Sequence, residues 1–286
     1  MSLKVAVVQA APVAFDTARS LEKALRSIEA ANGAELIVFP EAFLGGYPKG
    51  MDFGARVGSR SAEGRKWFRR YFEGAVDVPG RETESLGEAA RAQGAWVVMG
   101  VIERDGGTLY CTALMFSPQG ELAGKHRKLM PTAMERIIWG FGDGSTMPVL
   151  DTEIGKLGAV ICWENYMPLL RMAMYQKGIQ LYCAPTVDDR EIWISTMRHI
   201  AYEGRCFVMS ACQFMRAGEF PDGTEIRGGS VIVGPLGQVL AGPVYGEECV
   251  LRAEIDLGEI AEAKYDLDVA GHYSRPDVFQ LRVNEG

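Results

Sequence analysis

The strongest constraint on the fold is a short apolar segment that ends in a cysteine and leads into a helix start. Leu157 to Ile161 is apolar, with β-branched residues at its end, which is typical of a strand buried on both faces. Pro168 stands where a helix could begin, since a helix tolerates proline in its first turn, and mostly apolar residues follow. We therefore expect Cys162 at the carboxyl end of an inner strand, the edge of an open α/β sheet where ligands bind.

The rest of the chain alternates predicted strands with predicted helices, so the expected class is α/β. Ser85 and Glu88 have capping-box spacing and support the helix in which they lie. Two similar turns, 117–120 and 234–237, each follow an apolar strand, which predicts two pseudo-equivalent halves that pack as an αββα sandwich. Strands are expected at 3–10, 35–39, 96–102, 109–116, 121–128, 179–184, 206–212, 230–233 and 239–241, and helices at 21–31, 64–73, 83–93 and 189–203.

Composition narrows the class of protein further. The 286 residues are 48% hydrophobic and contain nothing that resembles a linker, so we expect a single domain over 1–286. The net charge of −7 without a block of like charges argues against a nucleic-acid partner. The absence of a signal peptide and of a membrane-length apolar run predicts a cytoplasmic protein that does not enter a membrane. Six scattered cysteines, without a CxxC pair or clustered histidines, predict free thiols and no bound metal.

A nucleophilic Cys162 needs a base or a cation beside it, because a thiol is mostly protonated at neutral pH. The usual partner is a histidine, and the chain has three, His126, His199 and His272. None is excluded by residue type, but each also reads as an ordinary surface or packed histidine. Taken alone, Cys162 itself is more often a small buried hydrophobe than a nucleophile.

A carboxylate and a lysine are the alternative helpers. Glu41 follows a predicted strand at its carboxyl edge, Lys128 ends another, and Glu135 comes seven residues later. A glutamate can take the thiol proton, while an ammonium group stabilises negative charge on a substrate atom. The run 142–145, Gly-Asp-Gly-Ser, could be a phosphate loop but lacks a following lysine, so we interpret it as a turn.

Three segments, 36–48, 126–145 and 158–171, resemble the signature blocks of the nitrilase superfamily. The Cys162-Trp163-Glu164 run and the late segment 271–277, Gly-His-Tyr-Ser-Arg-Pro-Asp, resemble the true nitrilase branch more narrowly. The resemblance implies the four-layer αββα sandwich, which doubles into an αββα–αββα assembly on dimerisation. It implies no cofactor and no metal.

Carried over by position, the resemblance implies that Glu41 is the general base, Lys128 the cation and Cys162 the nucleophile. It implies that Glu135 is a second glutamate that orients the site. On this interpretation Cys162 is the only one of the six cysteines that lies beside both Glu41 and Lys128.

The activity implied is hydrolysis of a small organic nitrile to an acid and ammonia through thioimidate and thioester intermediates. An amidase, a cyanide hydratase-type enzyme, or an inactive scaffold on the same fold are the alternatives. The predicted substrate contacts are Tyr47, Trp163 and Thr186. A homodimer or a higher homo-oligomer is expected, with residues 166–177 and part of 265–281 at the interface, because the segment after Cys162 is too apolar for one buried face.

Overall fold

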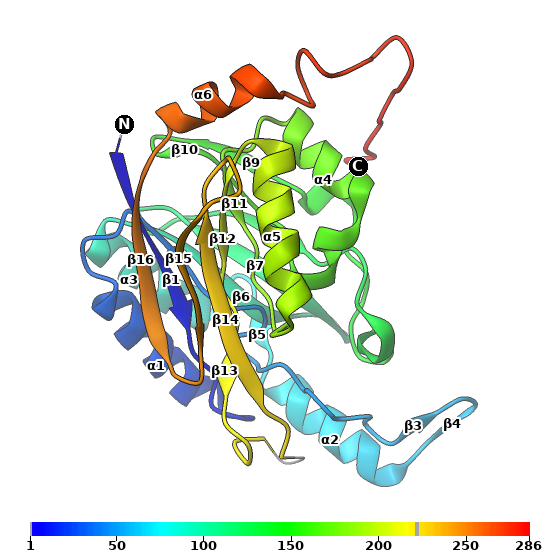
Figure 1. The fold of residues 1–286 in the computed structure, drawn as a ribbon. Helices are drawn as coiled ribbons and strands as arrows, with labels where there is room; N and C mark the ends of the chain where they lie inside the picture. The colour runs from blue at the N-terminus through cyan, green and yellow to red at the C-terminus, as the bar shows by residue number, and fades with distance from the viewer. Residues whose placement is uncertain (1, 221–222) are drawn as a thin grey trace.

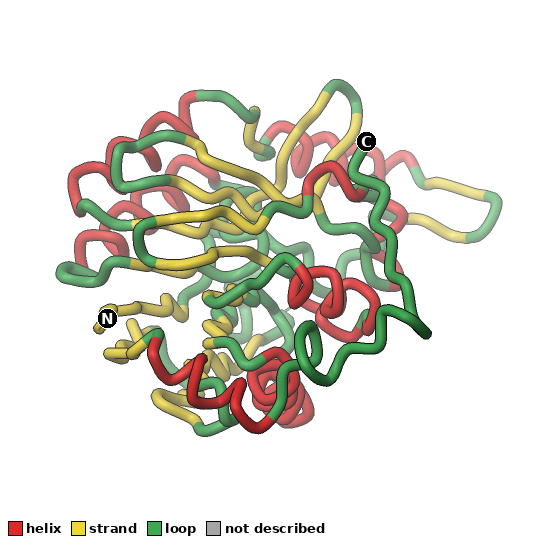
Figure 2. Tube along the Cα trace, turned by 90° about the horizontal axis from the view of Figure 1, so that it is seen from above, coloured by secondary structure: helices red, strands yellow, loops and turns green. Residues whose placement is uncertain are grey.

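Two sheets stacked face to face form the centre of the molecule, and helices cover their outer faces (Figures 1 and 2). The computed structural model describes residues 2–220 and 223–286. The stacking agrees with the predicted αββα sandwich. It arises because the inner strands are apolar on both faces, so that each sheet buries one face against the other sheet and one against helices.

The first sheet has seven strands in the order β16-β1-β2-β6-β7-β8, with β5 paired to β6. β1, β2 and β6 run parallel, β7 and β8 continue as antiparallel neighbours, and β16 pairs antiparallel with β1 at the other side. The bounds are β1 (Ser2–Gln9), β2 (Leu36–Val38), β5 (Val76–Asp77), β6 (Trp96–Asp105), β7 (Thr108–Phe116), β8 (Leu122–Arg127) and β16 (Cys249–Asp256).

The second sheet repeats this layout in the order β13-β14-β12-β11-β10-β9, with β15 paired to β14. β10, β11 and β12 run parallel, β14 and β15 follow antiparallel, and β9 pairs antiparallel with β10. Apart from the short strands β5 and β13, which pair differently, this is the pairing of the first sheet, as expected for two pseudo-equivalent halves. The bounds are β9 (Val149–Thr152), β10 (Gly155–Ala159), β11 (Leu181–Cys183), β12 (Phe207–Ser210), β13 (Phe214–Met215), β14 (Ile226–Val233) and β15 (Val239–Tyr245).

Each sheet has its own pair of covering helices. α1 (Thr17–Ala30) and α3 (Arg81–Gln93) pack on the first sheet, while α4 (Pro168–Gln176) and α5 (Glu191–Gly204) pack on the second. In α1 the buried side chains Ser20, Ala24 and Ile28 recur every four residues and form the stripe that faces the sheet. α6 (Gly258–Asp266) follows the last strand.

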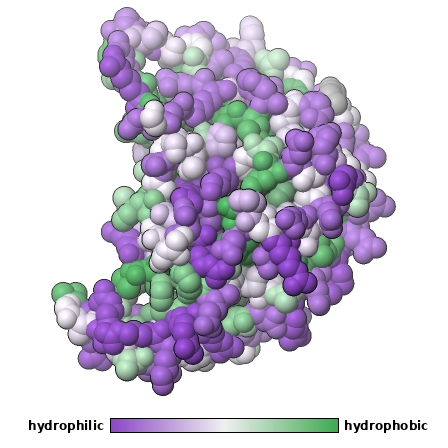
Figure 3. Space-filling view, turned by 180° about the vertical axis from the view of Figure 1, so that it is seen from behind, coloured by the Kyte–Doolittle hydropathy of each residue, from purple (hydrophilic) through white to green (hydrophobic). Residues whose placement is uncertain are grey.

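A two-stranded hairpin and one helix project from the body as an arm (Figure 1). They are β3 (Ala55–Arg56), β4 (Ser59–Arg60) and α2 (Ala62–Glu73), and the exposed side of the arm is mostly polar in the space-filling view, where it stands at the lower left (Figure 3). Among residues 2–220 and 223–286, no helix is both long enough and apolar enough to cross a bilayer.

Two local predictions were wrong. The capping box expected from Ser85 and Glu88 does not start a helix, because α3 already begins at Arg81, where Gly80 and Thr83 form the cap. The strand expected to reach Ile161 ends at Ala159. Beyond Ala159 the backbone still forms single hydrogen bonds with the neighbouring strand β11 and the residues after it, including Val160 N to Cys183 O at 2.9 Å.

Candidate active site

Glu41 lies at the carboxyl edge of the first sheet, in the loop after β2, and its side chain is fully buried. The loop presses against β6 at Gly100, where a Cβ atom would lie 2.1 Å from Pro40 O, so only glycine fits. Gln213 Nε2 donates to the carbonyl of Glu41 at 2.7 Å and ties the loop to the second half of the molecule. The backbone that carries the Glu41 carboxylate is thus fixed between the two halves of the molecule.

Lys128 follows β8, and its fully buried ammonium group joins two carboxylates. Nζ donates to Glu41 Oε1 at 2.7 Å and to Glu135 Oε2 at 2.9 Å. The face of the Trp139 ring lies 5.5 Å from Nζ and contributes a cation–π contact. One positive charge therefore sits between two negative ones, away from water.

Glu135 belongs to a short 3-10 helix, Ala133–Ile137, and is held from three sides. Besides Lys128, Thr132 N donates to Oε2 at 2.6 Å and the Tyr47 hydroxyl donates to Oε1 at 2.8 Å. Burial and, after it, the negative charge of Glu135 hold the pKa of Tyr47 above its usual range, so this hydroxyl stays a donor. These contacts fit the orienting role expected for Glu135.

Cys162 sits on a sharp bend between β10 and a 3-10 helix, Cys162–Tyr166, with φ at +50°. A left-handed conformation is unfavourable for cysteine and persists only when its surroundings impose it. Here Cys162 N donates to Pro185 O at 2.8 Å, and Asn165 Nδ2 donates to Cys162 O at 2.7 Å. Thr186 Oγ1 donates to Cys162 Sγ at 3.2 Å. These contacts hold the bend in place, and with it the position of the Cys162 sulfur at the cavity described below.

Burial and charge set the protonation states of the three groups. Burial and the nearby Glu41 charge raise the pKa of Cys162 well above that of a free thiol, with Lys128 opposing the shift. The resting sulfur is therefore protonated and needs a base. Burial also raises the pKa of Glu41, which Lys128 opposes. Burial opposes the charge of Lys128, but Glu41 and the other acidic groups outweigh it and hold its pKa above the usual value.

The second oxygen of Glu41 is available for proton transfer. In the described part of the chain, Oε2 is buried without a well-directed hydrogen bond, whereas Oε1 binds Lys128. The Cys162 thiol is near enough to lower the pKa of Glu41 by hydrogen bonding. Oε2 is thus the natural acceptor for the Cys162 proton.

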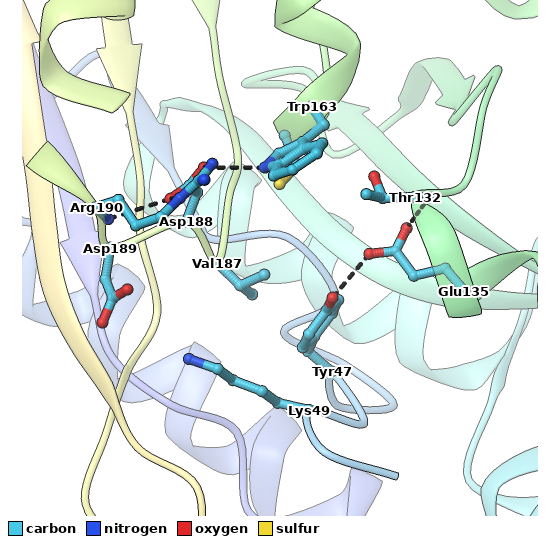
Figure 4. Close-up of a pocket in the computed structure, with 10 residues that line it drawn as sticks. Tyr47, Lys49, Thr132, Glu135, Trp163, Val187, Asp188, Asp189 and Arg190 are labelled. Carbon is cyan, nitrogen blue, oxygen red and sulfur yellow. Dashed lines mark hydrogen bonds and ion pairs between the residues drawn. The ribbon is translucent and has the colours of Figure 1, made fainter. Parts of the chain in front are cut away.

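A cavity of about 240 Å³ opens in front of the sulfur (Figure 4). Trp163 forms one wall, and its indole Nε1 donates to Asp188 Oδ2 at 2.9 Å. Arg190 binds the same carboxylate and stacks over the Trp163 ring with its guanidinium carbon 4.9 Å from the ring centre. The lining residues are Tyr47, Lys49, Thr132, Glu135, Cys162, Trp163, Val187, Asp188, Asp189 and Arg190.

The structure brings Glu41, Lys128, Glu135 and Cys162 together around one point, from three separate segments of the chain. Two of the three predicted substrate contacts, Tyr47 and Trp163, line the cavity. Thr186 is buried behind the cavity against the sulfur. Its contact to substrate stays a prediction, while its contact to Cys162 is direct.

The three histidines have other partners. His126 is buried against the Glu164 carboxylate, and His199 and His272 lie at the surface beside Glu203 and Tyr273. This favours the glutamate and lysine as the helpers of the cysteine.

One expectation about the cysteines was wrong. Cys111 Sγ donates to Glu41 Oε1 at 3.5 Å, and its backbone carbonyl accepts from Lys128 N at 2.8 Å, so Cys162 is not alone beside this pair. Nothing local could have revealed this, because Cys111 lies within an apolar strand. What separates the two thiols is access, since only Cys162 lines the cavity.

Asp188 and Arg190 were also missed. They were detectable in principle, because they follow the apolar strand β11 at the same carboxyl edge as Cys162.

A buried thiol with a carboxylate base and an ammonium group beside it is the arrangement of an enzyme that forms a covalent intermediate through a cysteine. The family model for "Carbon-nitrogen hydrolase" matches residues 4–265, and the chain belongs to this family, in its nitrilase branch. It is 58% identical to an "Aliphatic nitrilase" of Sinorhizobium fredii, over 99% of this chain and 96% of the relative. It is 56% identical to a "Bifunctional nitrilase/nitrile hydratase NIT4A" of Lupinus angustifolius, over 99% of this chain and 86% of the relative.

A solved structure supports the fold independently. The chain superposes on the Caenorhabditis elegans NitFhit protein with a TM-score of 0.80 and 23% identity, over 99% of this chain and 67% of that one. The predicted family, branch and sandwich fold are therefore confirmed.

Proposed function

We propose that this protein is a nitrilase, which hydrolyses a small organic nitrile to the carboxylic acid and ammonia. The observation that carries the proposal is the buried Lys128, whose ammonium group is hydrogen-bonded to Glu41 and Glu135 next to the thiol of Cys162. The relatives named as nitrilases support the choice of nitrile over other carbon–nitrogen substrates.

The first half of the reaction forms the carbon–sulfur bond. Glu41 takes the thiol proton of Cys162, and the thiolate attacks the nitrile carbon to give a thioimidate. Negative charge develops on the nitrogen, and Lys128 stabilises it and donates a proton to it. The proton that Glu41 took from the thiol then passes to Lys128, so that Glu41 is again a carboxylate and Lys128 again an ammonium group. This charge stabilisation is most effective in a dry site, which the burial of all three groups provides.

The second half consumes two water molecules. Glu41 removes a proton from the first water as it adds to the thioimidate carbon, and the nitrogen of the tetrahedral intermediate leaves as ammonia once it is protonated. A thioester to Cys162 remains. The second water, activated in the same way, releases the acid and returns the thiol.

Release of amide is a second candidate outcome, because the name of the lupin relative includes nitrile hydratase activity. The tetrahedral intermediate can break its C–S bond in place of its C–N bond, which frees the amide and restores Cys162 directly. We propose acid as the main product, since Glu41 holds the proton that the leaving nitrogen needs.

We propose that Tyr47 and Trp163 contact the substrate as cavity walls and that Thr186 acts on the sulfur. The cavity of about 240 Å³ suits a small nitrile, with Val187 as an apolar wall. Trp163 is held in place through Asp188, so its ring presents a fixed surface to the substrate.

The test is a panel of aliphatic, aromatic and arylacetonitriles, each with its matched amide, incubated with the purified enzyme in the presence of a chelator. Acid and ammonia in equal amounts from a nitrile are the expected result. Glu41→Gln keeps the shape of the side chain but removes the base, so it should abolish turnover. Fast amide hydrolysis with inert nitriles would identify an amidase, and an inert enzyme that binds nitriles would identify a scaffold.

We also propose a homodimer or a higher homo-oligomer. The apolar residues after Cys162 are only partly available for an interface, because Leu170, Ala173 and Met174 are buried within the chain. Leu169 remains 69% exposed, and α6 and the segment after it add the exposed side chains Tyr265, Tyr273, Val278 and Phe279. Such side chains favour burial against a second copy. Light scattering that gives an active monomer at micromolar concentration would contradict the proposal.

A further inference from the structure

A further buried carboxylate, Glu164, connects the segments that carry Lys128 and Cys162, although it does not line the cavity. It accepts a hydrogen bond from Leu129 N at 2.5 Å and another from Ile161 N at 2.9 Å. Leu129 directly follows Lys128, and Ile161 directly precedes Cys162. One side chain therefore holds the backbone next to the cation and the backbone next to the nucleophile.

His126 completes this arrangement. It is buried in β8, two residues before Lys128. Its Nδ1 lies 2.6 Å from Thr146 O, and its Nε2 lies 2.9 Å from Glu164 Oε2. A carbonyl can only accept a hydrogen bond, so Nδ1 carries a proton.

With Nε2 donating to the Glu164 carboxylate, the ring is an imidazolium whose charge balances that of Glu164. Burial opposes this charge, but the Glu164 carboxylate outweighs burial and the more distant Lys177, and the pKa of His126 is raised.

We propose that His126 and Glu164 are a positioning pair that sets the distance between Lys128 and Cys162, and through it the ratio of acid to amide released. The inference rests on the nitrilase function proposed above. Neither residue touches the substrate. Both act by fixing the backbone on which the reacting groups stand.

The physical reason lies in the tetrahedral intermediate. Loss of ammonia requires a proton to reach the nitrogen while Lys128 and Glu41 are in place, whereas expulsion of the Cys162 thiolate needs no such alignment. A displacement of about 1 Å can cost on the order of 100-fold in rate at such a step. If the pair loosens, the aligned route to acid slows most, and a larger share of the intermediate leaves as amide.

Two substitutions of His126 separate its contacts. In His126→Gln the amide nitrogen reaches the position of Nε2 and can still donate to Glu164. In His126→Asn the amide nitrogen reaches only the position of Nδ1, so the contact to Thr146 is kept and the contact to Glu164 is lost. Glu164→Gln keeps the shape of the side chain but has one oxygen for three donors. His199→Gln, at a surface histidine, is the control.

The measurements are kcat, KM and the acid-to-amide ratio on one nitrile that the wild type hydrolyses. For His126→Asn and Glu164→Gln we expect kcat to fall about 10- to 100-fold, the scale for losing a residue that orients a functional group by hydrogen bonding. KM should change less than about threefold, and amide should make up a clearly larger share of the product. His126→Gln should stay within several-fold of the wild type and keep its product ratio.

Equal losses of kcat together with equal product ratios in His126→Asn and His126→Gln would overturn the pair, since only His126→Gln can keep a donor to Glu164. An unchanged product ratio in Glu164→Gln would overturn it as well, and this variant decides the matter if His126→Asn fails to fold. A wild-type enzyme without nitrile turnover would instead contradict the proposed function.

Discussion

Replacing Lys128 by methionine tests whether one buried ammonium group serves both charge stabilisation and the protonation state of Glu41. Methionine keeps most of the volume and removes only the charge. At 2.7 Å from Glu41 Oε1, the ammonium contributes a Coulomb attraction of about 6 kcal/mol at an effective dielectric constant of 20. Measured costs of removing one partner of a buried pair are lower, about 3–5 kcal/mol.

Glu41 should respond by keeping its proton. Without Lys128, Glu135 still has its donors from Thr132 and Tyr47, whereas in the described part of the chain the side chain of Glu41 retains only the weak thiol donors Cys111 and Cys162. A loss of about 3 kcal/mol corresponds to about two pKa units, at 1.36 kcal/mol per unit. The acid limb of the pH–rate profile should therefore move to higher pH by about two units.

Turnover should also fall, by about 10²–10³-fold or more, the scale for losing one preorganised donor of developing charge. The assay is ammonia release against pH, with circular dichroism to verify the fold. Lys125→Met is the matched control, because Lys125 lies in β8, three residues before Lys128, and pairs with Glu103, which Arg127 also holds. If the turnover number of Lys128→Met stayed within tenfold of the wild type, and the acid limb of its pH–rate profile lay at the same pH, the role assigned to Lys128 would be wrong.

Three further predictions concern other parts of the molecule. Gly100→Ala should lower activity strongly, because the new Cβ would lie 2.1 Å from Pro40 O, while Gly124→Ala, with its nearest contacts at 3.4 Å, should be near-neutral; equal activities would contradict this. When the reaction with substrate is quenched during turnover, peptide mapping should place the covalent adduct on Cys162, and an adduct on any other cysteine would refute the assignment. Because the pKa of His126 is raised in the folded protein, its ion pair with Glu164 contributes stability that is fully present below about pH 6.5 and is lost as pH rises through the folded-state pKa of His126. The unfolding free energies of wild type and His126→Gln should therefore differ more near pH 6 than near pH 9. A constant difference would exclude the ion pair.

Local patterns in the sequence carried the fold and the outline of the site. The apolar runs that end before Glu41 and before Cys162 identify two carboxyl edges, because buried strands need continuous apolar residues and turns need their own residue types. The signature segments added the pairing of these residues with Lys128 and Glu135. These features are readable because each depends on neighbours within a few positions.

Only the tertiary structure decided which side chains share a space. Cys111 and Glu41 are 70 residues apart, and His126 and Glu164 are 38 apart, so their contacts depend on strand register and on how the two sheets stack. The same holds for Asp188 and the wall that it makes with Trp163. A buried polar group must find partners wherever packing places them, and no spacing along the chain encodes that choice.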